Sequence, residues 1–275
     1  MLVFPCCKIN LGLHVTERRP DGYHNLETLF YPIPLEDVLE VVPLSGAKKQ
    51  SWKLTLYGNS VAGNAEQNLV VKAYRLLAYR YDLPAVDIHL YKHIPSGAGL
   101  GGGSSDAAYM LLLLNDLFQL HLSVSQLEAF ATDLGADCAF FIRHQPVFAE
   151  GIGNLFTPVS LSLHGYRIVI VKPDIFVSTP EAFRGLTPQK PTLSLKEVAC
   201  QPVNTWRTCM TNDFEKTIFP IHPKIESLKK QLYEAGAIYA SMSGSGSAVF
   251  GLFEANAPLP SRTHFPNAFY FSCTL

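Results

Sequence analysis

Residues Pro95–Ala108 read PSGAGLGGGSSDAA, and this stretch decides the fold that we expect for the chain. Its five glycines have no Cβ, so the backbone can turn tightly and bring its N–H groups close to a ligand. Ser104, Ser105 and Asp106 are good helix-initiating residues, and the apolar run Ala107–Phe118 after them predicts a buried helix. A glycine loop that leads into a helix N-terminus suits a phosphate, because unpaired N–H groups and the positive end of the helix dipole meet there.

Two well-known glycine loops do not match this one. Gly97, Gly99 and Gly102 have the dinucleotide-binding spacing, but that fold needs a fully buried strand before the loop and an acid about 20 residues later. The preceding IHLYKHI alternates instead, and the region after Leu120 reads as helix. Gly103 stands where a P-loop has its lysine. A flexible linker is disfavoured because an apolar helix follows directly.

Composition excludes several classes of function. The chain has 275 residues, which is enough for two packed domains or one large one, and 48% of them are hydrophobic against 16% charged. These values predict a well-packed soluble protein. The net charge of −1 gives no basic field that would recruit nucleic acid or an anionic membrane. We therefore expect small-molecule partners.

The cysteines and the N-terminus indicate a cytoplasmic protein. The six cysteines form no C-x-x-C pair, and the nine histidines show no metal-ligand spacing, so reduced thiols and no structural zinc are expected. The N-terminal MLVFPCCKIN lacks the pattern of a signal peptide. The longest apolar run, within Ala107–Leu114, is far shorter than the roughly 20 residues of a membrane span.

The order of apolar patterns indicates an α+β fold. Branched and aromatic runs predict a meandering sheet with strands at Lys8–Val15, Leu26–Ile33, Val38–Val42 and Trp52–Tyr57. A helix at Asn68–Tyr81 should cover this sheet, and the strand Val86–Tyr91 should lead into the glycine loop. Later elements are expected as a helix at Ser125–Leu134, strands at Cys138–Ile142, Pro146–Glu150 and Tyr166–Val171, a helix beginning near Ser178 or Thr179, a helix ending at Gly236, and strands at Ile238–Met242 and Ala248–Phe253. Helices and strands without regular alternation favour α+β layers, with a second unit beginning near Pro158.

Three further features could carry chemistry. Lys8 and Asn10 fall on one face of an otherwise apolar strand, where they need partners or a ligand, unless Lys8 lies at the surface. Asp137, between a helix end and an apolar run, is either a functional carboxylate or a loop cap. Ser241–Ser247 reads SMSGSGS, which is either a second loop that approaches a ligand or a plain hairpin turn.

The chain resembles the galactokinase, homoserine kinase, mevalonate kinase and phosphomevalonate kinase (GHMP kinase) superfamily. The resemblance rests on PSGAGLGGGSSDAA and SMSGSGS, which occur in this order along the chain. Within it, the chain is most similar to the 4-diphosphocytidyl-2-C-methyl-D-erythritol kinases. That closer likeness rests on KINLGLHVTERRPDGYHNLETLF (Lys8–Phe30), QNLVVKAYRLL (Gln67–Leu77), LGADCAFFI (Leu134–Ile142), FAEGIG (Phe148–Gly153) and STPEAF (Ser178–Phe183). Only Gln189–Pro220 and the C-terminal segment carry no motif.

The resemblance implies a two-domain fold and a reaction. An N-terminal ATP-binding domain, residues 1–157, would resemble domain 2 of ribosomal protein S5, and a ferredoxin-like C-terminal domain would cover residues 158–275. The implied reaction is the ATP-dependent phosphorylation, with Mg²⁺, of the 2-hydroxyl of 4-diphosphocytidyl-2-C-methyl-D-erythritol in the non-mevalonate route to isoprenoid precursors. Mg²⁺ bridges phosphate oxygens in such transfers.

Site residues are also implied by the resemblance. Lys8 and Asp137 match the catalytic pair. Positions near ATP are Asn68, Lys92, Pro95, Ser96, Gly97, Ala98, Gly99, Leu100, Gly101, Gly102, Gly103, Ser104 and Ser105. Positions around the cytidine diphosphate substrate are Asn10, Tyr23, His24, Thr179, Phe183, Gly244, Ser245 and Gly246. Tyr23 and Phe183 could sandwich the pyrimidine while His24 reads its polar edge. The motifs assign no ligand to the metal.

Other functions fit the sequence less well. A nucleotide-binding sensor without catalysis would have lost Lys8 or Asp137, and both are present. An RNA-binding role, suggested by the fold of ribosomal protein S5, conflicts with the near-neutral charge. Superfamily kinases of mevalonate, homoserine or sugars are disfavoured by the DGYHNL and TPEAF motifs. The sequence leaves the oligomeric state open.

Overall fold

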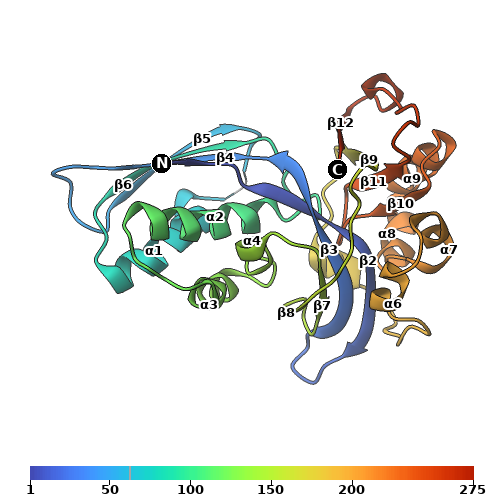
Figure 1. Cartoon of the computed structure of the whole chain (residues 1–275), viewed down its shortest axis with the longest axis horizontal. Helices are drawn as coiled ribbons and strands as arrows, with labels where there is room; N and C mark the ends of the chain where they lie inside the picture. Colours follow the sequence, from blue (N-terminus) through green and yellow to red (C-terminus); the bar gives the residue numbers. More distant parts are fainter. Residues whose placement is uncertain (62) are drawn as a thin grey trace. The chain divides into compact units, whose positions relative to one another are not determined.

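The computed structural model describes residues 1–61 and 63–275. The chain divides into two compact units, each assembled from separate segments and traced in Figure 1. Unit 1 comprises Met1–Cys7, Leu35–Ser96 and Gly101–Gln145, and unit 2 comprises Lys8–Pro34, Gly97–Leu100 and Pro146–Leu275. The units do not follow a single cut in the sequence, so the domain boundary expected at residues 157 and 158 stays a prediction.

The base of unit 1 is a four-stranded sheet in the order β1 (Leu2–Val3), β4 (Val38–Pro43), β6 (Val86–Lys92) and β5 (Trp52–Gly58). β4 and β6 are antiparallel, whereas β5 runs parallel to β6 because helix α1 (Leu69–Tyr81) provides the crossover between them. Leu39 of β4 lies opposite Leu90 of β6, and both are buried. Because successive side chains of a strand point to opposite faces of the sheet, these buried residues form one apolar face, which is turned toward the helices.

In the described part of unit 1, the packed α-helices are α1, α2 (Gly102–Leu117), α3 (Val124–Leu134) and α4 (Phe140–Arg143). In Figure 1, α1 and α2 lie along one face of the sheet. α2 is apolar on most sides, and Met110, Leu111 and Leu114 are fully buried. The expected buried helix after the glycine loop is therefore confirmed, and it is the central helix of this unit.

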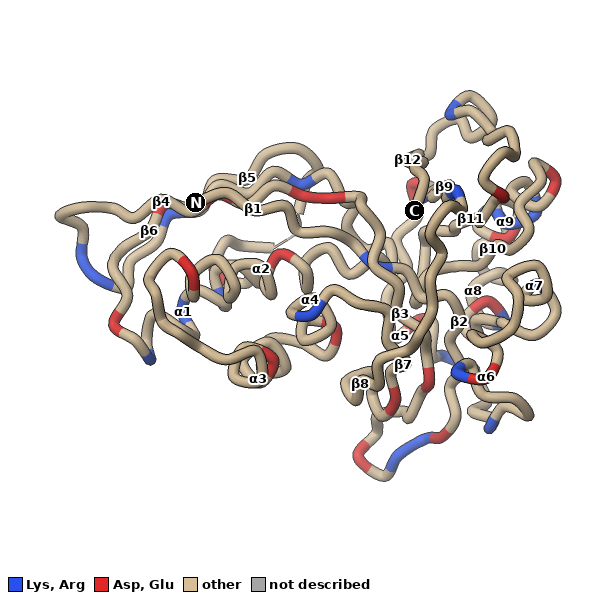
Figure 2. The backbone as a smooth tube through the Cα atoms, in the orientation of Figure 1, with Lys and Arg blue, Asp and Glu red and all other residues tan. Residues whose placement is uncertain are grey.

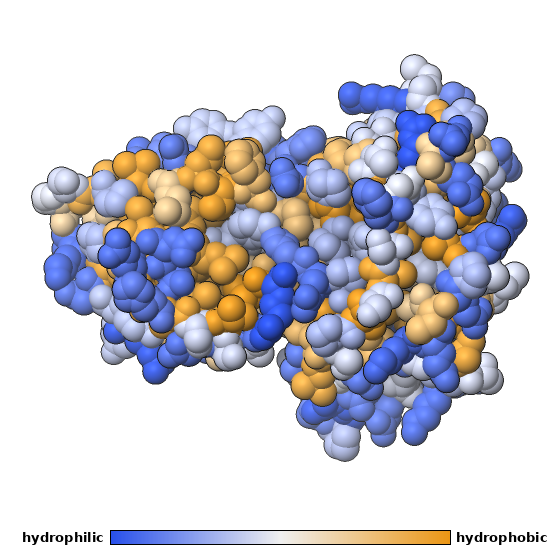
Figure 3. Space-filling view, in the orientation of Figure 1, coloured by the Kyte–Doolittle hydropathy of each residue, from blue (hydrophilic) through white to orange (hydrophobic). Residues whose placement is uncertain are grey.

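The opposite face of the same sheet carries exposed apolar side chains. Tyr57 of β5 lies opposite Tyr91 of β6 in register, and both are about half exposed, as is Leu2 of β1. On the side of the molecule drawn in Figure 3, hydrophobic residues, in orange, also reach the surface of this unit. Unit 1 therefore buries one face of its sheet and leaves apolar groups at the surface of the other.

Helix α2 begins earlier than Ser104, where its start was expected. Its first residue is Gly102, and its N-cap is Gly101, whose φ of +70° is left-handed and which makes no side-chain capping bond. A glycine reaches this backbone conformation without steric strain. The first turn of α2 therefore includes the last two glycines of the loop, and its N–H groups are not covered by a capping side chain at residue 101.

A buried cluster of charges ties three elements of unit 1 together. The ammonium of Lys92, at the end of β6, donates to Asp37, and to Asp106 in the first turns of α2 at 2.5 Å. Asp37 also accepts hydrogen bonds from the backbone N–H groups of His93 at 2.6 Å and Ile94 at 2.8 Å. The cluster thus fixes the N-terminal end of α2 against the strand that leads into the glycine loop.

One lysine and two carboxylates leave this cluster with one surplus negative charge. Burial alone would lower the pKa of Lys92, but the carboxylates of Asp106 and Asp37 outweigh it and hold that pKa above its usual value. Burial, together with the neighbouring Asp37, raises the pKa of Asp106 to about 7 against the opposing effect of Lys92. Burial and the surplus negative charge therefore move the pKa of Asp106 toward neutral pH.

Unit 2 contains two sheets. One has the order β10 (Tyr239–Met242), β11 (Val249–Phe253), β9 (Arg167–Pro173) and β12 (Ala268–Thr274), and all its pairs are antiparallel. The other has the order β2 (Cys6–Arg18), β3 (His24–Glu36), β7 (Val147–Glu150) and β8 (Leu155–Pro158). The helices of this unit are α5 (Thr179–Phe183), α6 (Leu195–Ala199), α7 (Trp206–Cys209), α8 (Glu215–Ile221) and α9 (Pro223–Glu234).

The core of unit 2 joins its helices to both sheets. Leu13 of β2 and Val169 of β9 belong to one buried cluster with Ile225, Leu228 and Leu232 of α9. The spacing of those three residues places them on one face of the helix, as the sequence predicts. Helix α9 ends just before Gly236, so its expected extent is confirmed as well.

The first four strands do not form one meander. β2 and β3 belong to a sheet of unit 2, whereas β4 and β5 belong to the sheet of unit 1. Pro32 and Pro34 near the end of β3 lack the N–H group that would continue a ladder, and the chain passes into unit 1 after Pro34. The two prolines mark this change of sheet, and a prediction made only from the branched and aromatic residues of the strands does not take them into account.

The strand expected at Cys138–Ile142 is wrong. The segment is a turn followed by α4, held by hydrogen bonds from the N–H of Cys138 to the carbonyl of Gly135 and from that of Phe141 to Cys138. A short buried apolar run fits a strand or a helix equally well by periodicity. The strands β8 and β12 and the short helices between residues 189 and 220 were not expected.

Charged residues of both signs alternate along each unit, as the blue and red segments of Figure 2 show. Among the described residues, no helix is both long enough and apolar enough to cross a membrane.

The pH dependence of the unfolding free energy tests the role of the charge cluster. Because the pKa of Asp106 is higher in the folded protein than the ordinary 3.8, its contribution favours folding at low pH and is lost as the pH rises from about 4 to about 7. Asp106→Asn keeps an oxygen for Lys92 without the surplus charge, so it should abolish this fall in unfolding free energy. Urea denaturation at a series of pH values measures it.

Asp37→Asn is the matched comparison. Asp37 supports two backbone N–H groups as well as Lys92, so its loss should lower stability throughout this range by about 3–5 kcal/mol, the usual effect of breaking a buried ion pair. If Asp106→Asn kept the wild-type pH dependence, the assignment of that titration to Asp106 would be wrong.

Candidate active site

Two glycine-containing loops lie backbone against backbone in unit 2. A Cβ on Gly99 would stand only 1.9 Å from the carbonyl oxygen of Ser243. The Ser243 hydroxyl donates to the carbonyl of Gly99 at 2.8 Å, and the N–H of Ala248 donates to the carbonyl of Ala98 at 3.1 Å. Residues 98–99 and 243–248 therefore come together through their backbones, and this contact requires a glycine at residue 99.

Lys8 lies beside this pair of loops. Its side chain is 4% exposed, and its ammonium donates to Oδ1 of Asn10 at 2.5 Å. The ammonium also lies 4.6 Å from the centroid of the Phe30 ring, a cation–π distance. Its backbone N–H donates to the carbonyl of Leu100 at 3.0 Å. The alternative of a surface lysine is therefore excluded.

Asn10 connects Lys8 to both loops. Its backbone N–H donates to the Ser243 hydroxyl at 3.1 Å, and its side-chain amide donates to the hydroxyl of Thr28 at 2.8 Å. Thr28 in turn donates to the carbonyl of Gly12 at 2.5 Å. Both hydrogen-bonding ends of the Asn10 side chain are thus occupied, so its orientation is fixed. The sequence did not single out Thr28, although it lies in β3 within the Lys8–Phe30 motif.

A buried asparagine holds the second loop in shape. The amide nitrogen of Asn212 donates to the carbonyls of Met242 and Gly244, each at 2.8 Å, and its Oδ1 accepts the N–H of Phe214 at 3.0 Å. Asp213 beside it accepts the N–H of Val15 at 2.9 Å. These residues lie in the stretch where no motif was found. The sequence offers only the short polar run Thr211–Asp213 as a signal of this clamp.

The residues expected around a pyrimidine also lie in unit 2. The rings of His24 and Phe183 are stacked, with centroids 4.6 Å apart and an angle of 18° between the planes. Phe214 packs its ring edge-on against Phe183 at 4.8 Å. Tyr23 is 63% exposed. His24 thus covers a face of Phe183, and its expected contact with the edge of a pyrimidine stays a prediction.

Helix α5 positions Thr179 and Phe183. Ser178 caps this helix in a capping box with Glu181, and Glu181 also meets Nε2 of His222 at 3.0 Å. Thr179 is its first residue and is exposed. The start of the helix, expected near Ser178 or Thr179, is confirmed.

Asp137 belongs to unit 1. It lies, partly exposed, in the turn between α3 and α4. The thiol of the next residue, Cys138, interacts with Ser104 in the first turn of α2, and burial raises the pKa of this thiol to about 11. The turn that carries Asp137 is thereby placed next to the N-terminal end of α2.

The other expected ATP contacts in unit 1 have clear structural partners. Asn68 caps α1, and its Oδ1 accepts the N–H of Val70 at 3.0 Å. Lys92 is held inside the charge cluster with Asp37 and Asp106. Ser105 differs, because its buried Oγ has no hydrogen-bond partner among the described residues.

The site residues expected from the sequence therefore fall into two groups. Unit 2 brings together Lys8, Asn10, the loop residues 97–100, the loop residues 244–246, His24 and Phe183. Unit 1 holds Asn68, Lys92, residues 101–105 and Asp137. The pairing of Lys8 with Asp137 stays a prediction, because one belongs to each unit. Within residues 1–61 and 63–275, no group of three or more His, Cys, Asp or Glu side chains could hold a metal ion.

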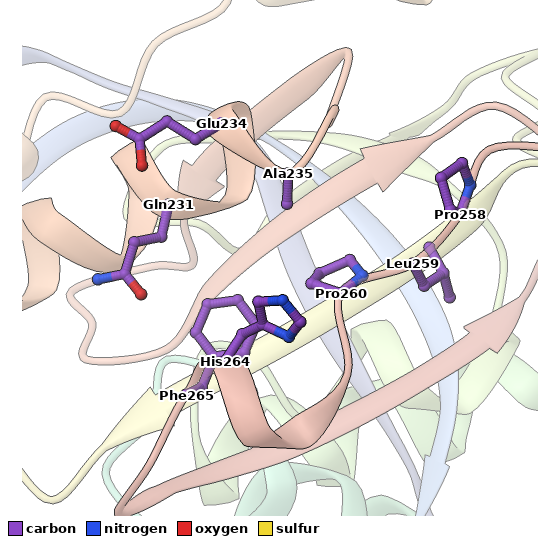
Figure 4. A pocket seen from close by; sticks show the side chains of 8 residues that line it. All are labelled: Gln231, Glu234, Ala235, Pro258, Leu259, Pro260, His264 and Phe265. Atoms are coloured by element: carbon purple, nitrogen blue, oxygen red, sulfur yellow. The ribbon is translucent and has the colours of Figure 1, made fainter.

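A hollow of about 380 Å³ lies elsewhere in unit 2 and is drawn in Figure 4. It is lined by Gln231, Glu234 and Ala235 at the end of α9 and by Pro258, Leu259, Pro260, His264 and Phe265. None of the expected site residues lines it. The candidate site is therefore defined by the two loops and their neighbours rather than by this hollow.

Two family models match the chain. The model for the N-terminal domain of GHMP kinases matches residues 68–145, and the model for their C-terminal part matches residues 196–259. The first match includes the glycine loop and Asp137, and the second includes SMSGSGS.

Close relatives and solved structures extend the match over the whole chain. A protein of Bacteroides fragilis named 4-diphosphocytidyl-2-C-methyl-D-erythritol kinase is 60% identical over 275 residues, all of both chains. One of the same name from Porphyromonas gingivalis is 48% identical over 256 residues, covering 92% of each chain. A crystal structure of 4-(cytidine 5'-diphospho)-2C-methyl-D-erythritol kinase superposes with a TM-score of 0.83 at 32% identity, over 99% of this chain and 98% of that one. The chain therefore belongs to the GHMP kinases and, among them, to the 4-diphosphocytidyl-2-C-methyl-D-erythritol kinases.

Proposed function

We propose that this chain transfers the γ-phosphoryl group of ATP to the 2-hydroxyl of 4-diphosphocytidyl-2-C-methyl-D-erythritol, giving the 2-phosphate and ADP in the methylerythritol phosphate route to isoprenoid precursors. The observation that carries the proposal is the packing of the two glycine loops beside Lys8 and Asn10. The proteins of the same family named above support the choice of substrate.

The glycine loop would hold the phosphates of ATP. Gly97 and Gly99 have φ values of +60° and +73°, and Gly101 caps α2 without a side chain. Such a backbone turns N–H groups toward an anion, and the start of α2 adds the positive end of its dipole. Among the expected contacts, Ala98 and Leu100 have buried side chains, so they would contribute through their backbones.

Lys8 and Asp137 would act on the transferred group and the attacking alcohol. The oxygen of the 2-hydroxyl forms a bond to the γ-phosphorus while the bond from that phosphorus to the bridging oxygen of ADP breaks. Asp137 would accept the hydroxyl proton as this happens, and Lys8 would offset the negative charge on the phosphoryl oxygens. Asn10 and Phe30 hold the Lys8 ammonium in place for this role.

The residues present fit a magnesium ion bound together with ATP. Ser105 offers a buried hydroxyl oxygen that makes no other hydrogen bond within the described residues, next to the expected position of the phosphates. Mg²⁺ prefers oxygen ligands and usually takes the others from substrate phosphates and water. When bound, the ion would neutralise charge on the phosphate oxygens. Ser105 would hold it through Oγ.

The cytidine end of the substrate would bind at the aromatic group of unit 2. Tyr23 offers an exposed ring, while the His24–Phe183 stack offers a second apolar surface with polar nitrogens at its edge. Gly244, Ser245 and Gly246 would approach the rest of the substrate through their backbone. Six cysteines without a C-x-x-C pair or a disulfide-framework spacing suit a reducing compartment, so we place the reaction in the cytoplasm.

An acceptor panel tests the substrate assignment. With ATP and Mg²⁺, the 4-diphosphocytidyl substrate should gain one phosphate by mass spectrometry, and mevalonate and homoserine should not react. A crystal structure of mevalonate kinase shares the fold, with a TM-score of 0.69 at only 13% identity, so mevalonate is a suitable alternative acceptor for this panel. Phosphorylation of mevalonate or homoserine without reaction of the cytidyl substrate would end this assignment.

Lys8 and Asp137 should be needed for turnover more than for binding. Losing a general base commonly lowers the rate by about 10²–10⁴-fold, so Asp137→Asn and Lys8→Met should each reduce kcat at least about a hundredfold. The double variant should be much less impaired than the product of the single effects, because the two residues act on one step. Single-turnover kinetics measures all four proteins.

Asp133→Asn is the control for this pair, because Asp133 is an exposed acid on the helix that precedes Asp137. It should keep wild-type turnover. A folded Asp137→Asn variant with near wild-type kcat would remove Asp137 from the mechanism and return it to the role of a loop residue.

A further inference from the structure

Phe176 is an exposed aromatic side chain that lies beside Gly97 of the glycine loop in unit 2. It is 72% exposed, in the segment that joins β9 to α5. Its ring carbons Cδ2 and Cε2 lie 2.6 and 2.7 Å from the point where a Cβ of Gly97 would stand. The ring therefore rests on the bare backbone of Gly97, and only a glycine there leaves room for it.

The neighbours of Phe176 fix this position. Val177 is buried in the core of unit 2, and Ile175 packs against the same core. The carbonyl of Ile175 accepts a hydrogen bond from the hydroxyl of Ser247 at 2.5 Å. Two inward-facing residues, one of them tied to the loop SMSGSGS, leave the residue between them to face outward. Phe176 is thus held at the surface by its backbone, although its ring has few neighbours.

The reaction needs a device that keeps water away from ATP. Water and the acceptor alcohol are both hydroxyl nucleophiles, and groups that promote attack by one also promote attack by the other. In the side reaction, the oxygen of water bonds to the γ-phosphorus, the bond to the bridging oxygen of ADP breaks, and the protons of water pass to phosphate and solvent. Excluding water from a closed site prevents this loss.

We propose that Phe176 is an apolar cover of the phosphate loop, whose ring keeps water from the γ-phosphoryl group of bound ATP while the acceptor alcohol is positioned. The inference rests on the proposed function, in which residues 97–103 hold the phosphates. Phe176 is then a positioning residue, since it takes no part in bond formation.

The coupling of ATP use to product formation tests this cover. We expect wild-type enzyme to form equal amounts of ADP and phosphorylated acceptor. Phe176→Ser should raise ADP release in the absence of acceptor by roughly tenfold, the size of effect that lost apolar contacts commonly have on discrimination. With acceptor present, ADP should exceed phosphorylated product. Phe176→Leu keeps an apolar side chain and should restore most of the coupling, and Phe176→Ala repeats the loss with a smaller change in polarity.

Leu155→Ser is the matched control, because Leu155 is also an exposed apolar residue of unit 2, at 60%, and lies in β8. It should leave the coupling unchanged. Equal amounts of ADP and product in Phe176→Ser and Phe176→Ala would overturn the proposal, even if both rates fell together. Absence of phosphorylated acceptor with the wild-type enzyme would instead contradict the proposed function, and ATP hydrolysis without acceptor would still show whether Phe176 excludes water.

Discussion

The contact between Gly99 and the carbonyl oxygen of Ser243 is the constraint on which the rest of the candidate site depends. At 1.9 Å from a would-be Cβ, that oxygen admits no side chain at residue 99. The two loops can therefore lie together only through bare backbone. The hydroxyl of Ser243 then reaches Gly99 and Asn10 at once, and Asn10 fixes the ammonium of Lys8. The position of a charged group thus follows from a backbone contact between segments 144 residues apart.

The two buried lysines hold different parts of the chain. Lys92 lies between two carboxylates inside unit 1 and serves to hold α2. Lys8 donates to Oδ1 of Asn10 and lies over the face of Phe30, and these contacts orient its ammonium in unit 2.

Much of this could be predicted from the sequence, because glycine runs and apolar periods are local signals. Glycine-rich runs predict the glycine loop and the loop SMSGSGS, and a long apolar run predicts the buried helix, because few other structures require these residue types. What failed depends on tertiary context. The run from Cys138 to Ile142 fits either a helix or a strand until its packing is known. Asn212 and Phe176 belong to no periodic apolar pattern. Their contacts are with Gly244 and Gly97, which are distant in the sequence, so only the folded chain shows them.

The affinity of Gly99→Ala for a non-hydrolysable ATP analogue, measured by calorimetry, tests the central claim most directly. Gly165→Ala is the matched control, since Gly165 also has a positive φ, of +85°, but nothing lies within 4 Å of its Cβ position. Both variants bear the backbone strain, and only the first displaces the Ser243 carbonyl. The account predicts that Gly99→Ala loses at least about tenfold in affinity, or about 1.4 kcal/mol, and that Gly165→Ala binds normally. Wild-type affinity in folded Gly99→Ala would contradict it.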